Sequence, residues 1–437
     1  MAGHPDCLFC AGMKQGFVSS GVKSIVSLSL LVFSCITLKA QQAGCTDPLA
    51  NNYNAAATVN DGSCTYNSVR YTPPSKVNPL SDSLQETSGL VWAANALWTI
   101  NDGGNAAILF KIDTVSRTVL QKVLIPAATN TDWEDIAFDG FHFYIGDFGN
   151  NVNGARTDLR IYKIPLAAIP DHAMQPVFSL PDSVLGIIRF TYADQPQPPQ
   201  PVATNSTAFD CEALVVAADT IHLFSKNWLA QSTTHYVINS VQPGDYVATP
   251  VETLPVGFLV TAASLSVGNN VLALLGYQAS GSGSHFMYLL SGYSNGRYFN
   301  GNKRRIDLPD ALAMGQAEGL CFKNAFTGYI SNERLSVNVS GVPITVRQRL
   351  RYFDMRQWVS GMRQSFIFWG NGAWATASNW TDAALPPLMP NRPGQVIVDP
   401  LPGGACNVTT PVALAAGMPL LLKAGKQMRV GQQLRWQ

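Results

Sequence analysis

Residues 134–147 read EDIAFDGFHFYIGD, in which an acidic residue opens a short apolar strand, a Gly-containing turn follows, and a second strand ends on another acid. The same order of residue types recurs along the chain. The five units open at Glu86, Glu134, Glu212, Ser264 and Glu318, and their second strands end at Asp102, Asp147, Lys226, Tyr277 and Asn332. Short apolar strands separated by Gly, Asn and Asp, with no long helical periodicity, predict an all-β fold.

The spacing of the units predicts a β-propeller. They open 48, 78, 52 and 54 residues apart, and a period near 50 residues with about four short strands per unit is typical of propeller blades. The long interval holds a proline-rich segment, residues 195–201, that cannot form a central strand. Residues 68–358 divided by roughly 48 residues per blade predict six blades, although five or seven stay open because only five units carry the pattern.

The balance of charges argues against nucleic acid as a partner. The chain has 29 basic and 28 acidic residues, and charged residues make up 13% of it, about half their share in an ordinary soluble domain. No basic cluster is larger than Lys303-Arg304-Arg305. A surface with so little positive potential does not attract a polyanion.

The N-terminus predicts export. A basic region with Lys14 and Lys23 precedes an apolar run over residues 25–38, and a small residue stands before Gln41, so we interpret residues 1–40 as a signal peptide. The run is too short and too rich in serine for a membrane span. We therefore expect a secreted or cell-surface protein with no transmembrane span. Attachment to the cell envelope, for example through a lipid on Cys35, stays open.

Residues 44–66 form a predicted module with almost no apolar core. Cys45 and Cys64 bracket it, and in an exported protein we expect them to form a disulfide that contributes about 3 kcal/mol. The segment closely resembles a short cysteine-bracketed motif that recurs in surface proteins of Bacteroidetes-type bacteria. Its polar residues suit a calcium site or, as the stronger interpretation, turns beside the disulfide; they are Asp47, Asn51, Asn60 and Asp61.

A second small β-module is expected over residues 366–437. It opens with Trp369-Gly-Asn-Gly-Ala-Trp374 and continues with Asn379-Trp380, and it resembles the small modules with a W-x-G and N-W pattern in the same kind of surface protein. Its aromatic residues favour core packing over a sugar-binding platform. We see no C-terminal sorting domain, so a truncated reading frame stays open.

The repeat also predicts a ring of carboxylates at one mouth of the central channel. If the first strand of each unit is innermost, its acidic residue and the end of the next strand lie at the same sheet edge, because an antiparallel hairpin returns there. The ring would consist of Glu86, Glu134, Glu212 and Glu318, with Asp102, Asp147, Lys226 and Asn332 just outside it. Two carboxylates about 6 Å apart repel by about 3 kcal/mol, so the ring needs protons, a lysine or a cation.

Calcium suits such a ring outside the cell, because Ca²⁺ accepts six to eight oxygen ligands in flexible geometry. We predict a Ca²⁺ site whose ligands are drawn from Glu86, Asp102, Glu134, Asp147, Asn150, Glu212 and Glu318. The alternative is that each Glu accepts hydrogen bonds from backbone N–H groups of the neighbouring blade.

Five short segments add a resemblance to known propellers. They are Glu86-Thr-Ser-Gly-Leu90, Asp132-Trp-Glu-Asp-Ile-Ala137, Gly146-Asp-Phe-Gly-Asn-Asn151, Asp210-Cys-Glu-Ala-Leu214 and Gln316-Ala-Glu-Gly-Leu320. Together they resemble uncharacterised exported propellers, which are similar in turn to phytase-like esterases and to the calcium-dependent lactonase and phosphotriesterase superfamily. The resemblance implies that a channel Glu, an Asn and an Asp hold a metal, with Glu86, Glu134, Asn150 or Glu212 as candidates. Ser264 departs from this pattern.

Other catalytic patterns are weak. The sequence has no G-x-S-x-G elbow, no H-E-x-x-H and no phosphate loop. Strand alternation turns Cys211 and Cys321 away from the channel, which predicts buried, reduced thiols. His235 and His285 are weak candidates for a general base.

Three functions stay open, since propellers host all of them. The leading hypothesis is binding of a small or polymeric extracellular ligand at a calcium-bearing channel mouth. The first alternative is a metal-dependent hydrolase of phosphoesters or lactones. The second is a non-catalytic scaffold for interactions.

Overall fold

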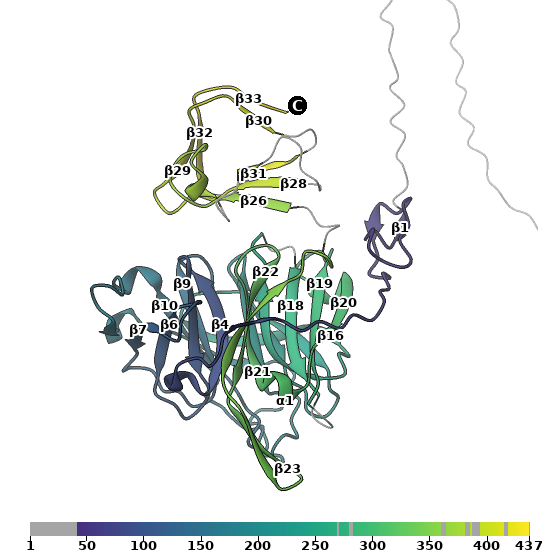
Figure 1. Ribbon diagram of the computed structural model, residues 1–437, viewed down its shortest axis with the longest axis vertical. Coiled ribbons are helices and arrows are strands. Elements are labelled where there is room, and N and C mark those ends of the chain that lie inside the picture. The colour runs from purple at the N-terminus through teal and green to yellow at the C-terminus, as the bar shows by residue number, and fades with distance from the viewer. Residues whose placement is uncertain are drawn as a thin grey trace, which may run out of the picture. The chain divides into compact units, whose positions relative to one another are not determined.

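A computed structural model describes residues 42–268, 271–278, 283–359, 364–380, 385–386, 394–414 and 418–436. The signal peptide predicted over residues 1–40 lies outside these ranges. No helix in the described part of the chain is long and apolar enough to cross a membrane. Strands dominate the chain (Figure 1), and the prediction of an all-β fold is confirmed.

The central part of the chain forms five blades of four strands each, and the outer strands of blades 2 and 3 pair in parallel, which joins these two blades in one eight-stranded sheet. Blade 1 contains β4 (Thr87–Ala93), β5 (Ala96–Asn101), β6 (Ile108–Ile112) and β7 (Val119–Leu124). Blade 2 contains β8 (Trp133–Phe138), β9 (His142–Asp147), β10 (Arg160–Pro165) and β12 (Gly186–Tyr192). Blade 3 contains β13 (Cys211–Ala217), β14 (Thr220–Ser225), β15 (Thr233–Ile238) and β16 (Gly244–Leu254). Blade 4 contains β17 (Leu259–Leu265), β18 (Val271–Tyr277), β19 (His285–Ser291) and β20 (Asn302–Asp307). Blade 5 contains β21 (Gln316–Phe322), β22 (Thr327–Glu333), β25 (Arg349–Asp354) and β3 (Ser75–Val77).

The first strand of each unit is the innermost, and these strands close a ring. β4 packs against β8, β8 against β13, β13 against β17, β17 against β21, and β21 returns to β4. The fold is therefore a β-propeller, as predicted, with five blades in place of the six obtained by dividing the length. The division was wrong because it counted insertions as blade residues.

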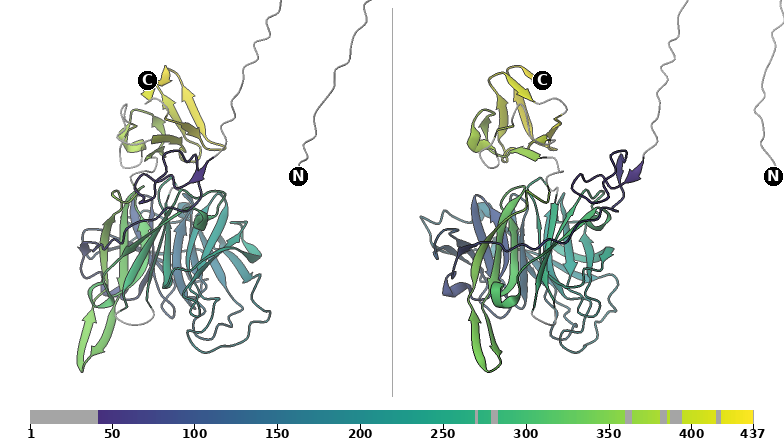
Figure 2. Two further views of the ribbon diagram at one scale, coloured as in Figure 1. Left: turned by 90° about the vertical axis from the view of Figure 1, so that its right-hand side faces the viewer. Right: turned by 45° about the vertical axis from the view of Figure 1, so that its right-hand side comes forward.

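Three insertions account for the extra length. One lies between β10 and β12 and contains β11 (Val177–Ser179), which extends blade 1 by pairing with β7. The second is the proline-rich segment after β12. The third is a hairpin of β23 (Leu335–Val339) and β24 (Val342–Val346), which projects beyond blade 5 (Figures 1 and 2).

The last blade is completed by β3, which comes from the N-terminal side of blade 1. Val77 of β3 pairs with Leu350 of β25, so strands far apart in sequence share one sheet. Such pairing covers the outer edge of β25 and ties the N-terminal side of blade 1 to the last blade.

Every inner strand has a β-bulge near its start, where its pairing with the second strand shifts by one residue. The bulge aligns five structurally equivalent residues: Ser88, Glu134, Glu212, Thr261 and Glu318. Three of the predicted ring positions are therefore correct. Glu86 and Ser264 are not equivalent to them, because the true counterparts are Ser88 and Thr261.

The N-terminal module contains a small parallel pair, β1 (Ala43–Gly44) with β2 (Val59–Asn60), and the predicted disulfide between Cys45 and Cys64. Its polar side chains form local turns: Asp47 accepts from the Leu49 N–H and Asp61 from the Ser63 N–H. These bonds are the ones expected of turn-forming residues.

Cysteine chemistry gives a direct test of the strand alignment. Cys211 and Cys321 are buried and unpaired, whereas Cys45 and Cys64 form a disulfide. Mass mapping of non-reduced peptides should therefore recover a peptide that links Cys45 to Cys64. Cys211 and Cys321 should react with an alkylating reagent only after unfolding, because burial raises the pKa of both thiols. A Cys211–Cys321 disulfide would contradict the blade alignment.

The C-terminal module is a parallel β-solenoid with three faces (Figure 1). One face stacks β26 (Gln364–Phe368), β28 (Gly394–Val398) and β31 (Leu420–Leu422). The second stacks β27 (Gly372–Ala373), β29 (Ala405–Val408) and β32 (Gln427–Val430). The third pairs β30 (Val412–Leu414) with β33 (Leu434–Trp436). Trp374 and Trp380 are buried in its core at 4% and 1% exposure, which confirms the prediction of core packing.

Candidate metal centre

Three carboxylates converge beside the start of the inner strand of blade 2. Asp102 follows β5, Asp132 precedes β8, and Glu134 occupies the β8 bulge; one oxygen from each lies within 4.8 Å of the other two. The bulge is what turns Glu134 toward the other two, because an extra residue re-aims the side chain of a strand. We call Asp102, Asp132 and Glu134 the acidic triad.

Glu134 is the most deeply buried member of the acidic triad. Its side chain belongs to a residue that is 6% exposed, and its carboxylate accepts no hydrogen bond from any residue in the described ranges. Burial and the nearby charges of Glu212 and Asp102 raise its pKa well above the ordinary value. The Glu134 oxygens keep some contact with solvent, and a proton or a cation would offset the cost of holding this charge in a largely buried position.

The other two members of the acidic triad are also perturbed. Burial, followed by the charges of Asp102 and Asp210, raises the pKa of Asp132 to about 7. Burial is also the main cause that raises the pKa of Asp102. Both residues are half-buried, so they can reach solvent or a ligand while Glu134 stays inside.

Two glycines make room for the acidic triad. A Cβ on Gly103 would lie 2.5 Å from Asp132 Oδ1, and a Cβ on Gly149 would lie 2.1 Å from Glu134 Oε1. Any larger residue at either position would occupy the space between the carboxylates. Close approach, and not an unusual backbone angle, explains glycine at these two sites.

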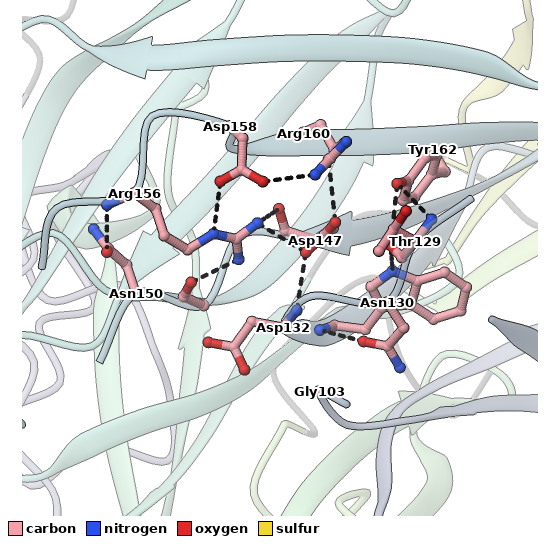
Figure 3. A network of polar contacts seen from close by, with 12 residues as sticks. Gly103, Thr129, Asn130, Asp132, Asp147, Asn150, Arg156, Asp158, Arg160 and Tyr162 are labelled. Atoms are coloured by element: carbon pink, nitrogen blue, oxygen red, sulfur yellow. Dashed lines mark hydrogen bonds and ion pairs between the residues drawn. The ribbon is translucent and has the colours of Figure 1, made fainter. Parts of the chain in front are cut away.

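A network of hydrogen bonds and ion pairs fixes the segments next to the acidic triad (Figure 3). Asp147 Oδ1 accepts the backbone N–H of Asp132 at 3.0 Å and also pairs with Arg156. Arg156 donates to the Gly149 carbonyl at 2.8 Å, and Arg160 pairs with Asp147 Oδ2 at 3.1 Å. Asp147 therefore positions the Asp132 and Gly149 loops and is not part of the acidic triad, contrary to its predicted role as a ligand.

The polar groups of Asn150 are also engaged in hydrogen bonds away from the acidic triad. Its Oδ1 accepts the Arg156 backbone N–H, its Nδ2 donates to the Phe209 carbonyl, and its own N–H donates to Asp210. The sequence assigned it to the metal because it follows a tight turn, but the turn's own hydrogen bonds use its amide group.

Lysine neutralises the adjoining part of the predicted ring. Lys226 Nζ lies 2.9 Å from Glu212 Oε1, and both side chains are buried. Burial opposes the charge of Lys226, but the attraction of Glu212 outweighs it and raises the pKa of the ammonium group. The Lys226 ammonium also lies over the rings of Trp228 and Tyr277. Glu212 thus has a cationic partner that Glu134 lacks.

The remaining predicted residues lie around the Lys226–Glu212 pair or outside it. Glu318 accepts a hydrogen bond from Gln316 at 2.7 Å, and burial is the main cause that raises its pKa to about 7. Glu86 is exposed and accepts from Asn105. Asn332 donates to the Glu333 and Arg347 carbonyls. Of the seven predicted ligands, the structure therefore brings Asp102 and Glu134 together and surrounds them with Glu212 and Glu318.

Among the carboxylates that the sequence analysis missed are Asp132 and Asp210. Both stand two residues before a ring glutamate, in the segments Asp132-Trp-Glu134 and Asp210-Cys-Glu212. The D-x-E spacing was visible, and alternation along a strand places both acids on one face. Asp210 is bound by the Asn150 N–H and the Trp228 indole, so only Asp132 joins the acidic triad.

The raised pKa values predict how stability depends on pH. In the metal-free protein, Asp132, Glu134 and Glu318 bind protons more tightly when folded than when unfolded. Stability from this source is present below pH 4 and is lost as pH rises through about 7. For protein depleted of metal on a chelating resin, the melting temperature measured from pH 6.5 to 8 should fall, and Ca²⁺ should reduce the fall. Below this window two buried histidines act in the opposite direction, because burial lowers the pKa of His222 to about 3 and of His285 to about 4. A rise over this range would contradict the assignment.

The network behind the acidic triad gives a second prediction. Arg156→Leu removes the contacts to Asp147 and Gly149, so calcium affinity should weaken by about tenfold, as for other residues that orient metal ligands. Arg189→Leu is the matched control. Arg189 is exposed and its ion pair with Asp245 is long, at 3.9 Å, so the substitution removes no strong contact. Equal calcium affinities for the two variants in a calorimetric titration would contradict the positioning role.

Comparison with known proteins does not identify a family. No family model and no curated protein matches the sequence. Similar solved structures include hydrazine synthase of Kuenenia stuttgartiensis (TM-score 0.31, 9% identity, 64% of this chain and 65% of that chain). They also include a 6-phosphogluconolactonase-like protein from Bacteroides uniformis (TM-score 0.29, 12% identity, 66% and 75%) and a Lactobacillus plantarum protein (TM-score 0.29, 13% identity, 60% and 70%). The chain thus covers less than two thirds of hydrazine synthase, and similarity at this level assigns neither a family nor an activity.

Proposed function

We propose that the protein is a secreted β-propeller that binds Ca²⁺ through the acidic triad and an extracellular ligand beside it. The observation that supports this most is Glu134, a carboxylate that is almost fully buried, faces two further carboxylates and has no hydrogen-bond donor among the described residues. Glu212, in the equivalent position of the next blade, has Lys226. A cation at the acidic triad would give Glu134 the partner that its neighbour already has.

The donor set favours calcium over softer metals. All three groups are carboxylates, and oxygen ligands suit Ca²⁺ or Mg²⁺ while Zn²⁺ sites use His and Cys. Three carboxylates supply at most six of the six to eight oxygens that Ca²⁺ accepts. Because Asp102 and Asp132 are half-buried, the remaining ligands would be water or oxygens of a bound molecule. A phosphate, carboxylate or polyol oxygen has the required chemistry.

A hydrolase is the second candidate, favoured by Glu318, which lies outside the acidic triad. Burial is the main cause that raises the pKa of Glu318 to about 7, where a carboxyl group can accept and release a proton at neutral pH. A bound metal would polarise a phosphoester or lactone substrate. The carboxylates of this chain would orient the substrate and hold the proton of the attacking water.

Calcium titration of the metal-depleted protein tests the proposal. Calorimetry should detect a site that binds Ca²⁺ more tightly than Mg²⁺. Asp132→Asn should weaken it, while Asp245→Asn, which changes an aspartate whose side chain is 82% exposed, should not. Turnover of phosphoesters or lactones that depends on Ca²⁺ would select the hydrolase. Calcium binding without turnover would leave ligand binding as the function, and no calcium binding would reject both.

A further inference from the structure

Two histidines and a glutamate form a line of hydrogen bonds across blade 3. His222 lies on β14, His235 on β15 and Glu252 on β16. Nδ1 of His222 is 2.8 Å from Nε2 of His235, and Nδ1 of His235 is 3.1 Å from Oε1 of Glu252. We call these three residues the His–His–Glu cluster. It links three consecutive strands and lies outside both the acidic triad and the network next to the triad.

The His–His–Glu cluster has little access to water. His222 and His235 are 6% and 0% exposed, and the side chain of Glu252 is 11% exposed. Aromatic rings enclose the two imidazoles: Phe224 stacks on His235 at 5.1 Å, and Tyr298 lies 5.1 Å from each of them. Because so little of the cluster is exposed, each of its polar contacts needs a hydrogen of its own.

The number of hydrogens decides the charge of the cluster. The His222 ring also forms a hydrogen bond with the Ala217 backbone; since Nδ1 faces His235, Nε2 is the nitrogen left to donate. The Ala217 carbonyl and the Glu252 carboxylate only accept, so an acceptor stands at each end. Three hydrogen bonds require three hydrogens, whereas two neutral imidazoles supply one each. Without one additional proton, the lone pairs of His222 Nδ1 and His235 Nε2 would face each other at 2.8 Å.

The surroundings favour His235 as the carrier of this proton. Burial, followed by the charge of His235, lowers the pKa of His222 to about 3, so His222 is the neutral member. Two further titratable groups interact with the charge of Glu252. One is Tyr298, whose pKa is raised mainly by burial, and the other is Lys303 on β20, whose pKa is lowered mainly by burial. Of the described cationic groups, only His235 lies within 4.0 Å of the Glu252 carboxylate.

We propose that the His–His–Glu cluster is a pH-sensitive switch, which holds β14, β15 and β16 together while His235 carries a proton and loosens them when the proton leaves. Above about pH 6.5 the histidines of an unfolded chain are neutral. A proton held only by the folded protein therefore stabilises it there, and this stability is lost as pH rises further. The effect reaches blade 2, because β16 also pairs with β12. Calcium has no part in the switch.

Glu252→Gln tests the count of hydrogens with a side chain of the same size. The amide can donate to Nδ1 of His235, so the variant completes the line of hydrogen bonds with two neutral imidazoles. The melting temperature of the parent minus that of the variant should fall by about 2 to 4 °C between about pH 6.5 and 8. The pH dependence of the acidic triad is common to both proteins and cancels in this difference.

Asp245→Asn is the matched control for the loss of charge. Asp245 lies on the same strand, β16, and its side chain is 82% exposed. Its removal changes no contact of the His–His–Glu cluster. The melting temperature of this variant should therefore differ from that of the parent by the same amount at every pH.

Nuclear magnetic resonance of the full chain with isotope-labelled histidine locates the proton. At about pH 6.5, one buried ring of the parent should carry a hydrogen on both nitrogens and should lose one as pH rises. No buried ring of Glu252→Gln should carry two. Amide exchange of β15, compared with the variant at each pH, should become faster in the parent once the proton has left.

Three results would overturn the proposal. They are a difference in melting temperature that does not change with pH, parent spectra in which no buried ring carries two hydrogens at about pH 6.5, and release of the proton with no change in the amide exchange of β15. If Glu252→Gln does not fold, the spectra of the parent still decide whether His235 carries the proton.

Discussion

Glu134→Gln is expected to abolish the calcium response of the protein and to make the metal-free protein more stable. In the parent, Ca²⁺ at a hundredfold excess over its Kd should raise the free energy of unfolding by about 2.7 kcal/mol, since it binds only the folded state. The variant removes the buried charge that lacks a donor. Without metal, relief of repulsion from Asp102, Asp132 and Glu212 should raise the free energy of unfolding by about 1 kcal/mol.

Thermal unfolding with Ca²⁺ and after metal depletion measures both effects. Asp245→Asn is the matched control, because the Asp245 side chain is 82% exposed and lies outside the acidic triad. It should keep the calcium response and leave metal-free stability unchanged. The N-terminal module is the same in all three proteins, so calcium bound there would not explain a difference. A calcium response equal to that of the parent, or a destabilised metal-free Glu134→Gln, would reject the metal site.

Asp135→Ala is expected to cause the largest loss of stability of any substitution considered for this protein. Asp135 is fully buried and joins three blades: its carboxylate accepts the N–H groups of Ile136, Leu214 and Ala263 at 2.8, 3.0 and 3.5 Å. Alanine would leave buried donors unsatisfied in β8, β13 and β17. At about 1 kcal/mol or more for each, the free energy of unfolding should fall by about 3 kcal/mol.

The expected shift in melting temperature is roughly 6 to 12 °C for a domain of this size. Asp135→Asn keeps one acceptor oxygen and should lose less. Asp171→Ala changes an exposed aspartate whose side chain is 66% accessible, so it should change the melting temperature little. If Asp135→Ala melted like Asp171→Ala, the buried carboxylate would not be joining the blades.

Several features of this protein could be predicted from local sequence because they depend on neighbouring residues alone. Alternating apolar strands and Gly, Asn and Asp turns fix the all-β fold. That the first strand of each unit is innermost was a condition of the sequence argument, and the contacts between blades establish it. Alternation also places Cys211 and Cys321 in the packed layers, where both are buried. The acids at Glu134, Glu212 and Glu318 stand at equivalent positions because each opens the strand in the same way.

The tertiary structure alone decided the blade count and the ligand set, because both depend on contacts between distant residues. Sequence length cannot distinguish a blade from an insertion, and closure by β3 involves a strand far from its partner β25. Only the pairing of each inner strand with its second strand shows which residue occupies the bulge, so Ser88, and not Glu86, is equivalent to Glu134. The sequence does not show that Asp147 pairs with Arg156 and Arg160. It also does not show that Glu212 pairs with Lys226. Glu134 differs from them because none of the cationic residues in the described ranges lies against it.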